Sequence, residues 1–528
     1  MKIFVCQTKT LAGNLDENFR IISDLYLESV KLGADICLFP ELALSGYGAG
    51  DLLHQKGFIK NVELLIERLV SLTEKTCLLI PTPLPLRGKL YNTLIAARDG
   101  RIIDISYKKE LPVHGIFDEK RYFTSGKPAI ITINNIKIGL PICEDIWHPE
   151  ACMELKEEGA QLFLVANASP YEKGKLQKRI NIVKQRFEET NIPMIYCNQV
   201  LGQDGIIFDG RSFCYDGELK IIGKDFESDR QIIDFTENKF TPTFTYPLDI
   251  KEYEVILRAM TLGVHDYVLH NGFKKVILGL SGGIDSALVA FIAIKALGKE
   301  NVGTFMLPTK FTSNESIQDA RELAGNLGIS LDSIDISKIF DSFTETLNNY
   351  SAPLRNPITG QNIQSRIRGS ILMALANENG ALLLTTGNKS EYATGYATIY
   401  GDMNGAFNPI KDLYKTEIYA LANFINKDEN IIPERIITKA PTAELSFNQK
   451  DSDSLPEYSI LDKILEDHIE NDLNQAELFQ KYDRVLVEKI INLVKNSEFK
   501  RNQSAPGVKI SHRAFEKERR YPITNSFK

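Results

Sequence analysis

The sequence lacks any long apolar run. Of its 528 residues, 43% are hydrophobic, yet no stretch approaches the roughly 18 consecutive apolar residues of a membrane-spanning helix. The opening decapeptide turns polar after Cys6, so it has no signal-peptide centre. Neither sign of charge dominates, since 62 basic and 69 acidic residues give a net charge of −7. We therefore expect no membrane association and no general nucleic-acid binding.

Cysteine is also scarce. The chain has seven cysteines, no two of which form a CxxC pair. Such a set fits neither a disulfide framework nor a zinc ribbon, and it favours a reduced, cytoplasmic location. Six of the seven lie in no chemically suggestive context. We assign to packing Cys6, Cys37, Cys77, Cys152, Cys197 and Cys214.

Two halves alternate short apolar runs with helical stretches, which indicates α/β sheets covered by helices. The first half contains the strand-like runs KIFVCQ, ADICLFP, CLLIP, IKIGLPIC, LFLVAN and PMIYCN. Residues 236–247 are polar, rich in Thr and Pro, and without periodicity. We expect a first domain at 1–240, a linker at 241–252 and a second domain at 253–528. The second half contains the strand KKVILGL, followed by a helix that ends near Gly298.

A phosphate-binding pattern follows that strand. Residues 281–286 read SGGIDS, and glycines at a strand-to-helix turn let backbone amides approach an anion. The Ser281 and Ser286 hydroxyls can donate, whereas Asp285 would repel a phosphate unless Mg²⁺ bridged the two. The alternative is a structural turn with a serine cap. The Walker pattern GxxxxGK[ST] is absent, which excludes an ordinary P-loop ATPase.

This loop resembles that of the N-type ATP pyrophosphatases. The family adenylylates a carbonyl or carboxylate of its substrate and releases pyrophosphate. The loop alone does not select one activity within that family.

Three residues of the first half suggest amide hydrolysis. Glu41 follows the run ADICLF, Lys108 lies in YKKELP, and Cys143 is expected to end the strand IKIGLPIC. A thiol can attack, a carboxylate can take its proton and later activate water, and an ammonium can stabilise negative charge. Singly, each residue is equally compatible with packing. Together they resemble the Glu-Lys-Cys triad of the nitrilase superfamily, whose fold is an αββα sandwich.

The combination of the two motifs resembles one family, the glutamine-dependent NAD synthetases. The resemblance extends over the whole chain through segments such as LPICEDIWHPE, NIQSRIRG, YGDM and PGVKISHRAF. It implies a nitrilase-like sandwich followed by a Rossmann-like parallel α/β domain of the pyrophosphatase type. It also implies that glutamine, deamido-NAD and ATP are substrates, that Mg²⁺ is required and that the chain forms a homo-oligomer.

The resemblance also implies roles for single residues in the first domain. His114, Ser169 and Lys175 would contact glutamine, with Lys175 pairing with its α-carboxylate. The family usually carries Tyr where His114 stands, so this contact departs from the pattern. Glu119 is a candidate second carboxylate near Lys108.

In the second domain the resemblance implies an ATP site, a deamido-NAD site and a metal site. The ATP site would comprise Gly279, Leu280, Ser281, Gly282, Gly283, Ile284, Asp285, Ser286, Thr386 and Lys415. The deamido-NAD site would comprise Asn362, Arg366, Glu391, Tyr396 and Lys509. Asp285 and Glu391 would hold the metal. Each of these residues is also compatible with a surface or packing role.

Three other interpretations remain open. The first domain could be a glutamine sensor without catalysis, although the complete set of Glu41, Lys108 and Cys143 argues against this. The chain could amidate another substrate, although NIQSR and YGDM argue against that. It could also be a nitrilase with a regulatory nucleotide-binding domain, which pyrophosphate release dependent on deamido-NAD would exclude.

Overall fold

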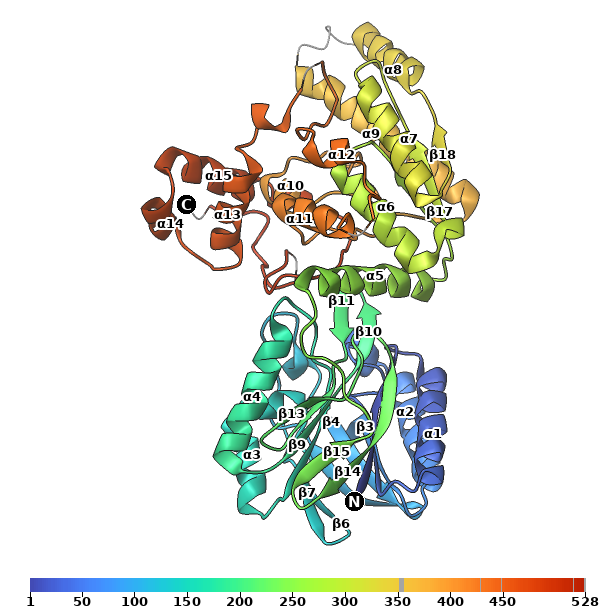
Figure 1. Ribbon diagram of the computed structural model, residues 1–528, viewed down its shortest axis with the longest axis vertical. Coiled ribbons are helices and arrows are strands. Elements are labelled where there is room, and N and C mark those ends of the chain that lie inside the picture. Colours follow the sequence, from blue (N-terminus) through green and yellow to red (C-terminus); the bar gives the residue numbers. More distant parts are fainter. Residues whose placement is uncertain (351–355, 428, 448, 516, 527–528) are drawn as a thin grey trace. The chain divides into compact units, whose positions relative to one another are not determined.

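The computed structural model describes residues 1–350, 356–427, 429–447, 449–515 and 517–526. These residues form two compact units (Figure 1). The first comprises residues 1–201 and 207–250, and the second comprises residues 202–206 and 251–528. Within the described residues, no helix combines the length and apolarity needed to cross a membrane.

The first unit contains two stacked sheets, each with a parallel centre and antiparallel edges. One sheet runs, in spatial order, β15 (Lys239–Pro242), β14 (Asp229–Thr236), β1 (Lys2–Gln7), β2 (Ile36–Leu38), β3 (Cys77–Leu86), β4 (Lys89–Arg98) and β5 (Arg101–Tyr107). The other runs β13 (Leu219–Ile221), β12 (Phe213–Tyr215), β9 (Met194–Asn198), β8 (Leu162–Asn167), β7 (Ile136–Gly139) and β6 (Ile130–Ile133).

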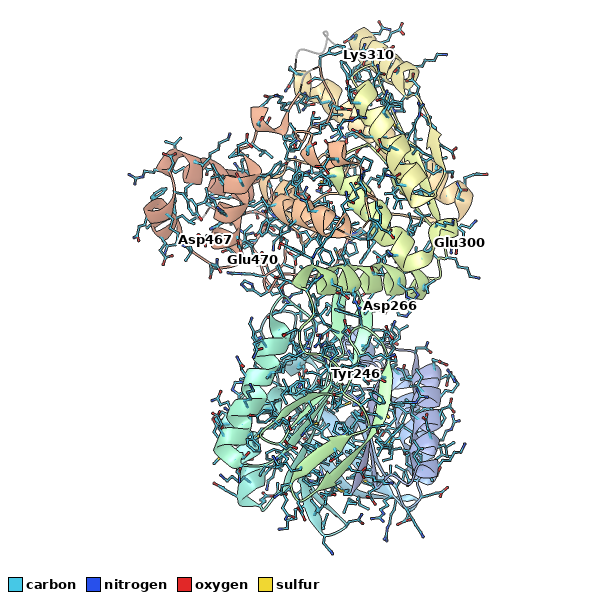
Figure 2. All side chains as sticks on the ribbon, viewed as in Figure 1. Tyr246, Asp266, Glu300, Lys310, Asp467 and Glu470 are labelled. Carbon is cyan, nitrogen blue, oxygen red and sulfur yellow. The ribbon has the colours of Figure 1, made fainter. Side chains whose placement is uncertain are left out.

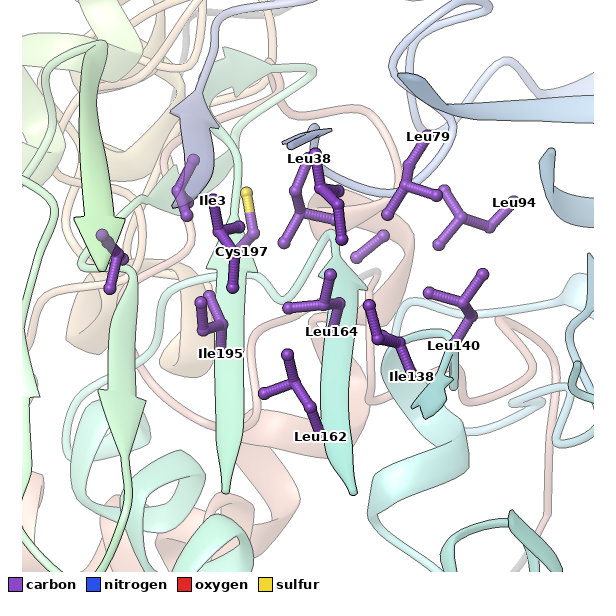
Figure 3. Close-up of a cluster of buried hydrophobic side chains, with 14 of the residues drawn as sticks. Ile3, Leu38, Leu79, Leu94, Ile138, Leu140, Leu162, Leu164, Ile195 and Cys197 are labelled. Carbon is purple, nitrogen blue, oxygen red and sulfur yellow. The ribbon is translucent and has the colours of Figure 1, made fainter. Parts of the chain in front are cut away.

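Helices cover the outer face of each sheet. On one side lie α1 (Leu15–Lys31) and α2 (Lys56–Ser71), and on the other lie α3 (Pro149–Glu157) and α4 (Lys175–Thr190) (Figure 1). Leu38 and Leu79 of one sheet meet Leu164 and Ile195 of the other in a buried core (Figure 3). The arrangement confirms the predicted αββα sandwich. The six cysteines assigned to packing are all buried in hydrophobic cores.

One expected strand is shorter than predicted. The strand β7 ends at Gly139, so Cys143 does not end it but begins a 3-10 turn, η3 (Cys143–Ile146). Pro141 explains the early end, because proline has no N–H to continue a ladder of hydrogen bonds. The parallel pairing resumes only as an isolated bridge between Ile142 and Ala166.

A hairpin leaves the first unit. The strands β10 (Val200–Gln203) and β11 (Ile206–Asp209) pair with each other, and residues 202–206 belong to the second unit although the sequence placed them in the first domain. The Gly202 N–H donates to Asp266 at 2.8 Å (Asp266 is labelled in Figure 2). The Lys509 N–H donates to the Gly205 carbonyl at 2.8 Å. The expected linker at 241–252 begins inside β15 and ends on the first residue of the next helix.

The second unit contains a parallel sheet flanked by helices, which confirms the predicted Rossmann-like class. Its strands run β18 (Leu331–Ser333), β17 (Val302–Met306), β16 (Val276–Gly279) and β19 (Leu382–Leu383). Its principal helices are α5 (Glu252–His270), α6 (Ile284–Leu297), α7 (Asn314–Leu327), α8 (Ser337–Tyr350), α9 (Pro357–Asn379), α10 (Lys389–Thr394) and α11 (Lys415–Ile425).

A smaller helical cluster follows the sheet region. It comprises α12 (Glu434–Thr438), α13 (Tyr458–Ile469), α14 (Gln475–Lys481), α15 (Arg484–Asn496) and α16 (Glu498–Arg501). The helices α13, α14 and α15 share one apolar core, which includes Leu461, Leu478 and Ile490. Tyr414 also belongs to this core, so the cluster packs against the residue that precedes α11.

Candidate active sites

A fully buried lysine organises the first site. Lys108 follows β5, and its ammonium donates to Glu41 at 2.6 Å and to Glu119 at 2.7 Å. The Asn92 amide also donates to Glu41, and the Tyr47 hydroxyl donates to Glu119, each at 2.7 Å. Burial disfavours the charge of Lys108, but Glu119 and Glu41 outweigh this effect and hold its pKa well above the usual value. Burial also raises the pKa of Glu119, against the opposing effect of Lys108.

Cys143 lies beside this cluster in a strained turn. Its φ is 44°, a left-handed conformation that a residue other than glycine seldom adopts. Burial and the Glu41 carboxylate raise the pKa of the Cys143 thiol well above its usual value, while Lys108 opposes them. The resting thiol is therefore protonated, and it needs a base to become a nucleophile. Glu41 is the carboxylate whose charge acts most strongly on it.

The expected glutamine-contacting residues have different surroundings. The exposed His114 has its Nε2 3.3 Å from Oε1 of Glu144, the residue after Cys143. Lys175 begins α4, and its ammonium lies 4.9 Å from the centre of the Trp147 ring. Ser169 is buried and follows β8.

The Ser169 hydroxyl is held by a neighbouring cation. Its oxygen accepts a hydrogen bond from Arg179 Nε at 2.9 Å, and Arg179 also binds Asp209 at 2.7 Å. Arg179 therefore fixes the position of the Ser169 hydroxyl.

The predicted strand, turn and helix around SGGIDS are confirmed as β16, the loop and α6, which ends at Leu297 before Gly298. Gly282 has φ +80°, and a Cβ there would lie 2.3 Å from the Ser316 carbonyl oxygen, so a larger residue cannot fit. The Ser281 hydroxyl oxygen accepts from the Gly283 N–H at 3.2 Å and lies 3.2 Å from the Ser286 hydroxyl. Local hydrogen bonds thus fix the conformation of the loop at the N-terminus of α6, an end of a helix that favours an anion.

A second lysine lies between carboxylates in this unit. Lys415 Nζ donates to Asp285, and it lies 3.8 Å from Glu391. Asn388 donates to the other oxygen of Asp285 at 2.9 Å. Burial and the Asp285 charge raise the pKa of Glu391 well above its usual value, while Lys415 opposes them. The structure therefore brings together Asp285 and Lys415, which the sequence assigned to the ATP site, and Glu391, which it assigned to the deamido-NAD and metal sites.

This cluster lines a cavity of about 300 Å³. Of the predicted nucleotide-site residues, those in the lining are Gly279, Leu280, Ser281, Gly283, Ile284, Asp285, Ser286, Thr386, Glu391, Tyr396 and Lys415. Gly282 belongs to the same loop. Among the described residues of the lining, Asn362, Arg366 and Lys509 do not occur.

The three predicted deamido-NAD residues outside the lining differ in position. Asn362 accepts a hydrogen bond from the Thr398 hydroxyl at 2.9 Å, and Thr398 lines the cavity. Arg366 donates to the Ile399 carbonyl at 3.2 Å. Lys509 is buried, where its ammonium donates to the Ser511 carbonyl at 2.8 Å and lies 3.4 Å from Glu518.

Several residues at these sites were not predicted from the sequence. In the first unit they are Tyr47, Asn92, Asp145 and Arg179. In the second unit they are Arg368, Lys439 and Glu444, which line the cavity. Lys439 Nζ lies 3.3 Å from the Gly282 carbonyl oxygen, and burial lowers the pKa of Arg368 to about 10. Asp145 lies within the segment CEDIW and Arg368 within the segment NIQSRIRG, and these segments could have directed attention to them.

The fold and the two sites define an enzyme that joins an amide hydrolase to a nucleotide-dependent ligase. Comparison with protein families agrees with this class. Residues 2–234 match the carbon-nitrogen hydrolase family, and residues 256–504 match the NAD synthase family.

Full-length relatives identify the family. The chain is 41% identical to the glutamine-dependent NAD(+) synthetase of Xanthomonas campestris pv. campestris, over 100% of this chain and 98% of the relative. It is 40% identical to that of Thermotoga maritima, over 100% and 99%. A solved glutamine-dependent NAD+ synthetase from Acinetobacter baumannii, in complex with ADP, superposes with a TM-score of 0.81 at 37% identity, over 99% and 98%. The chain belongs to the glutamine-dependent NAD(+) synthetase family, as the sequence motifs predicted.

Proposed function

We propose that this chain hydrolyses glutamine in its first unit and uses the ammonia to convert deamido-NAD into NAD at the expense of ATP in its second unit. One observation carries the proposal: a buried Glu-Lys-Cys cluster and an SGGIDS cavity occur in a single chain of this family. The assembled cluster favours a catalytic first unit over a glutamine sensor.

In the first unit, Glu41 takes the thiol proton as Cys143 attacks the side-chain amide carbon of glutamine. As the bond to nitrogen breaks, Glu41 passes this proton to the leaving nitrogen, so that ammonia departs and a thioester remains. The carboxylate of Glu41 is then free to take a proton from the water that hydrolyses the thioester, which regenerates the thiol and releases glutamate. Lys108 stabilises the negative charge that develops on the carbonyl oxygen, and its hydrogen bond to Glu41 holds that carboxylate in position. Ser169, Lys175 and His114 would bind the substrate.

In the second unit, the carboxylate of deamido-NAD attacks the α-phosphorus of ATP, and pyrophosphate leaves. Ammonia then displaces AMP from the resulting mixed anhydride to form the amide. A carboxylate is a poor acceptor for amines until a better leaving group replaces its oxygen, which explains the need for ATP. Loop residues 279–286, Thr386 and Lys415 would contact ATP.

The other predicted nucleotide-site residues would serve deamido-NAD. Asn362, Arg366, Glu391, Tyr396 and Lys509 would contact it, with the Tyr396 ring offering a flat surface to the nicotinate. The positions of Glu391 and Tyr396 in the cavity lining support these two contacts, whereas the other three residues are not in that lining.

Mg²⁺ would be held by Asp285 and Glu391 together with phosphate oxygens. Such a set suits this ion, which usually takes one or two carboxylates plus substrate phosphates. The described residues contain no group of three or more acidic, His or Cys side chains able to hold a metal by themselves. The ion would neutralise charge on the phosphates, and Lys415 would contribute further positive charge. We further propose a cytoplasmic homo-oligomer that binds no nucleic acid.

The decisive test supplies the full chain with deamido-NAD, ATP and glutamine, and measures NAD, glutamate and pyrophosphate. NAD formation with one glutamate per NAD or more is expected. Glutamate release without NAD formation would favour a nitrilase with a regulatory domain. If ammonium replaces glutamine in a second assay, NAD formation with ammonium but not with glutamine, and without glutamate release, would favour a sensor. Amidation of a different acid from a substrate panel would favour another amidotransferase.

A further inference from the structure

Asp145 lies two residues after Cys143 and is completely buried. Its carboxylate accepts three backbone hydrogen bonds and no side-chain hydrogen bond among those of the described residues. The Lys109 and Glu110 N–H groups donate to Oδ1 at 2.9 and 2.8 Å, and the Ile142 N–H donates to Oδ2 at 2.9 Å. One side chain thus joins the segment after Lys108 to the residue before Cys143.

These bonds close the strained turn that carries the nucleophile. The Asp145 N–H donates to the Ile142 carbonyl at 3.0 Å, while the Ile142 N–H donates to the Asp145 carboxylate. Cys143 lies between the two residues that exchange these hydrogen bonds. Its φ of 44° is unfavourable, so the conformation needs such surrounding bonds to hold it in place. Without the carboxylate, the Ile142 amide would be buried without an acceptor, which is costly.

The other two bonds act on the lysine. Lys109 and Glu110 follow Lys108 directly, so fixing their amides fixes the backbone from which the Lys108 side chain extends into the buried cluster. Asp145 therefore sets the position of Cys143 relative to Lys108 and Glu41, although it is not seen to bond to any of the three. Burial raises the pKa of Asp145 to about 7, while the three amides and the Lys108 charge oppose this rise.

We propose that Asp145 is a positioning residue for glutamine hydrolysis, which holds Cys143 in its turn and Lys108 beside it. The proposal rests on the proposed glutaminase function of the first unit. It requires no contact between Asp145 and glutamine, so its removal should slow the chemical steps more than it weakens substrate binding.

The test replaces Asp145 in the full chain by Asn, which retains the shape but replaces one acceptor oxygen by an NH₂ group. Misplacement of a reacting group by about 1 Å can cost on the order of 10²-fold in rate. We expect kcat for glutamate release to fall by about that factor, with KM for glutamine changed by less than about 3-fold. Alkylation of Cys143 by iodoacetamide, followed by mass spectrometry of its peptide, should slow in parallel.

The matched control is Asp99→Asn, the same chemical change at an exposed turn between β4 and β5. For each variant, the rate of NAD formation with glutamine is divided by the rate with ammonium in the same preparation. Misfolded protein lowers both rates by the same factor, so it does not change this ratio. A ratio and an alkylation rate equal to those of Asp99→Asn would overturn the proposal, as would a rise in KM with kcat unchanged. Absence of glutamate release from the unsubstituted chain would instead refute the proposed function itself.

Discussion

Each unit places a buried lysine between two carboxylates, but the two arrangements differ in what surrounds them. Lys108 is sealed with Glu41 and Glu119 at 2.6 and 2.7 Å, and all three side chains are almost completely buried. Lys415 binds Asp285, lies 3.8 Å from Glu391 and faces a cavity of about 300 Å³. In the first cluster, Lys108 is already hydrogen-bonded to both carboxylates. In the second cluster, Lys415 is bonded to only one of its two carboxylates, and the adjacent cavity can hold a charged substrate that exchanges these ion pairs for new ones.

Under the proposed function, similar groups of a lysine and two carboxylates would serve two different chemistries. A thiol attack needs fixed groups in a dry site, where their electrostatic effect is strong. Transfer of an adenylyl group needs charges that can meet phosphates and a metal ion arriving with the substrate. The variants below test whether the two clusters act separately.

The largest effect is expected for Cys143→Ala. Glutamine-driven NAD formation should fall by roughly 10³-fold or more, because no other group supplies the nucleophile. Ammonium-driven NAD formation should stay within about 2-fold of the unsubstituted chain, since activation of the carboxylate requires no thiol. Steady-state assays with each nitrogen donor measure both. Loss of the two activities together in a folded variant would contradict the division between the units.

The next largest effect is expected for Asp285→Asn. Turnover should fall by about 100-fold with either nitrogen donor, because the charge that opposes Lys415 and would help to hold Mg²⁺ is removed. Glutamate release in the absence of ATP should persist. An Mg²⁺ titration of NAD formation provides the second measurement, and an unaltered rate and Mg²⁺ dependence would refute the metal role of Asp285.

A moderate effect is expected from pH. Because the pKa of Asp145 is raised to about 7, its carboxylate gains a proton as the pH falls from about 8 to 6. The group then loses its charge and one oxygen carries a hydrogen, so it becomes a weaker acceptor for the backbone amides. Glutamate release should decline by several-fold across this range with an inflection near pH 7, and Asp145→Asn should remove the inflection. The charged group acting on this carboxylate is Lys108, which remains protonated throughout. A profile with the same inflection in both proteins would show that another group titrates.

The raised pKa of Asp145 has the opposite consequence for stability: activity should rise with pH, whereas the contribution of Asp145 to the free energy of unfolding should fall. The unfolded chain holds an Asp proton only below about pH 3.9, whereas the folded chain holds the Asp145 proton up to about pH 7. Between these values the folded state binds more protons, so the contribution of Asp145 to the free energy of unfolding should decrease as the pH rises. Denaturant titrations at pH 5 and pH 8, compared between the unsubstituted chain and Asp145→Asn, measure this contribution. A difference between the two proteins that does not vary with pH would contradict it.

The smallest effect is expected for His114→Tyr, which restores the residue usual in the family. Imidazole and phenol differ in size and in their hydrogen-bonding groups, so the contact with the substrate should differ between the two side chains. KM for glutamine should therefore change by about 3-fold on substitution, whereas ammonium-driven turnover should not change. Equal KM values for the two proteins would mean that His114, 3.3 Å from Glu144, only packs in its loop.

Sequence patterns predicted what is local in the chain and missed what is not. The SGGIDS turn and β1 follow from adjacent residues, and the structure has them as expected. The helix α5 begins at Glu252, the last residue of the expected linker. Tyr47 donates to Glu119, which is 72 positions later in the sequence. Asn92 donates to Glu41, which is 51 positions earlier. A tyrosine and an asparagine are common in loops and strands, so nothing in the neighbouring sequence distinguishes them.

The same limit applies to Cys143 and Lys509. The apolar run IKIGLPIC predicted a strand up to Cys143, but Pro141 interrupts the ladder and creates the turn on which the strained thiol depends. Lys509 was predicted from a family segment to meet the dinucleotide, and that contact remains a prediction. The structure places its ammonium against Ser511 and Glu518, partners that pattern reasoning cannot identify.

The hairpin at residues 202–206 has a consequence for dissecting the enzyme. Because these five residues belong to the second unit while the chain on both sides of them belongs to the first, no single cut separates the two activities into intact fragments. A fragment ending at residue 250 would retain Gly202 and Gly205 but lose their partners Asp266 and Lys509. Recombining halves from different relatives would therefore require matching this loop to its recipient as well as choosing a junction near residue 250.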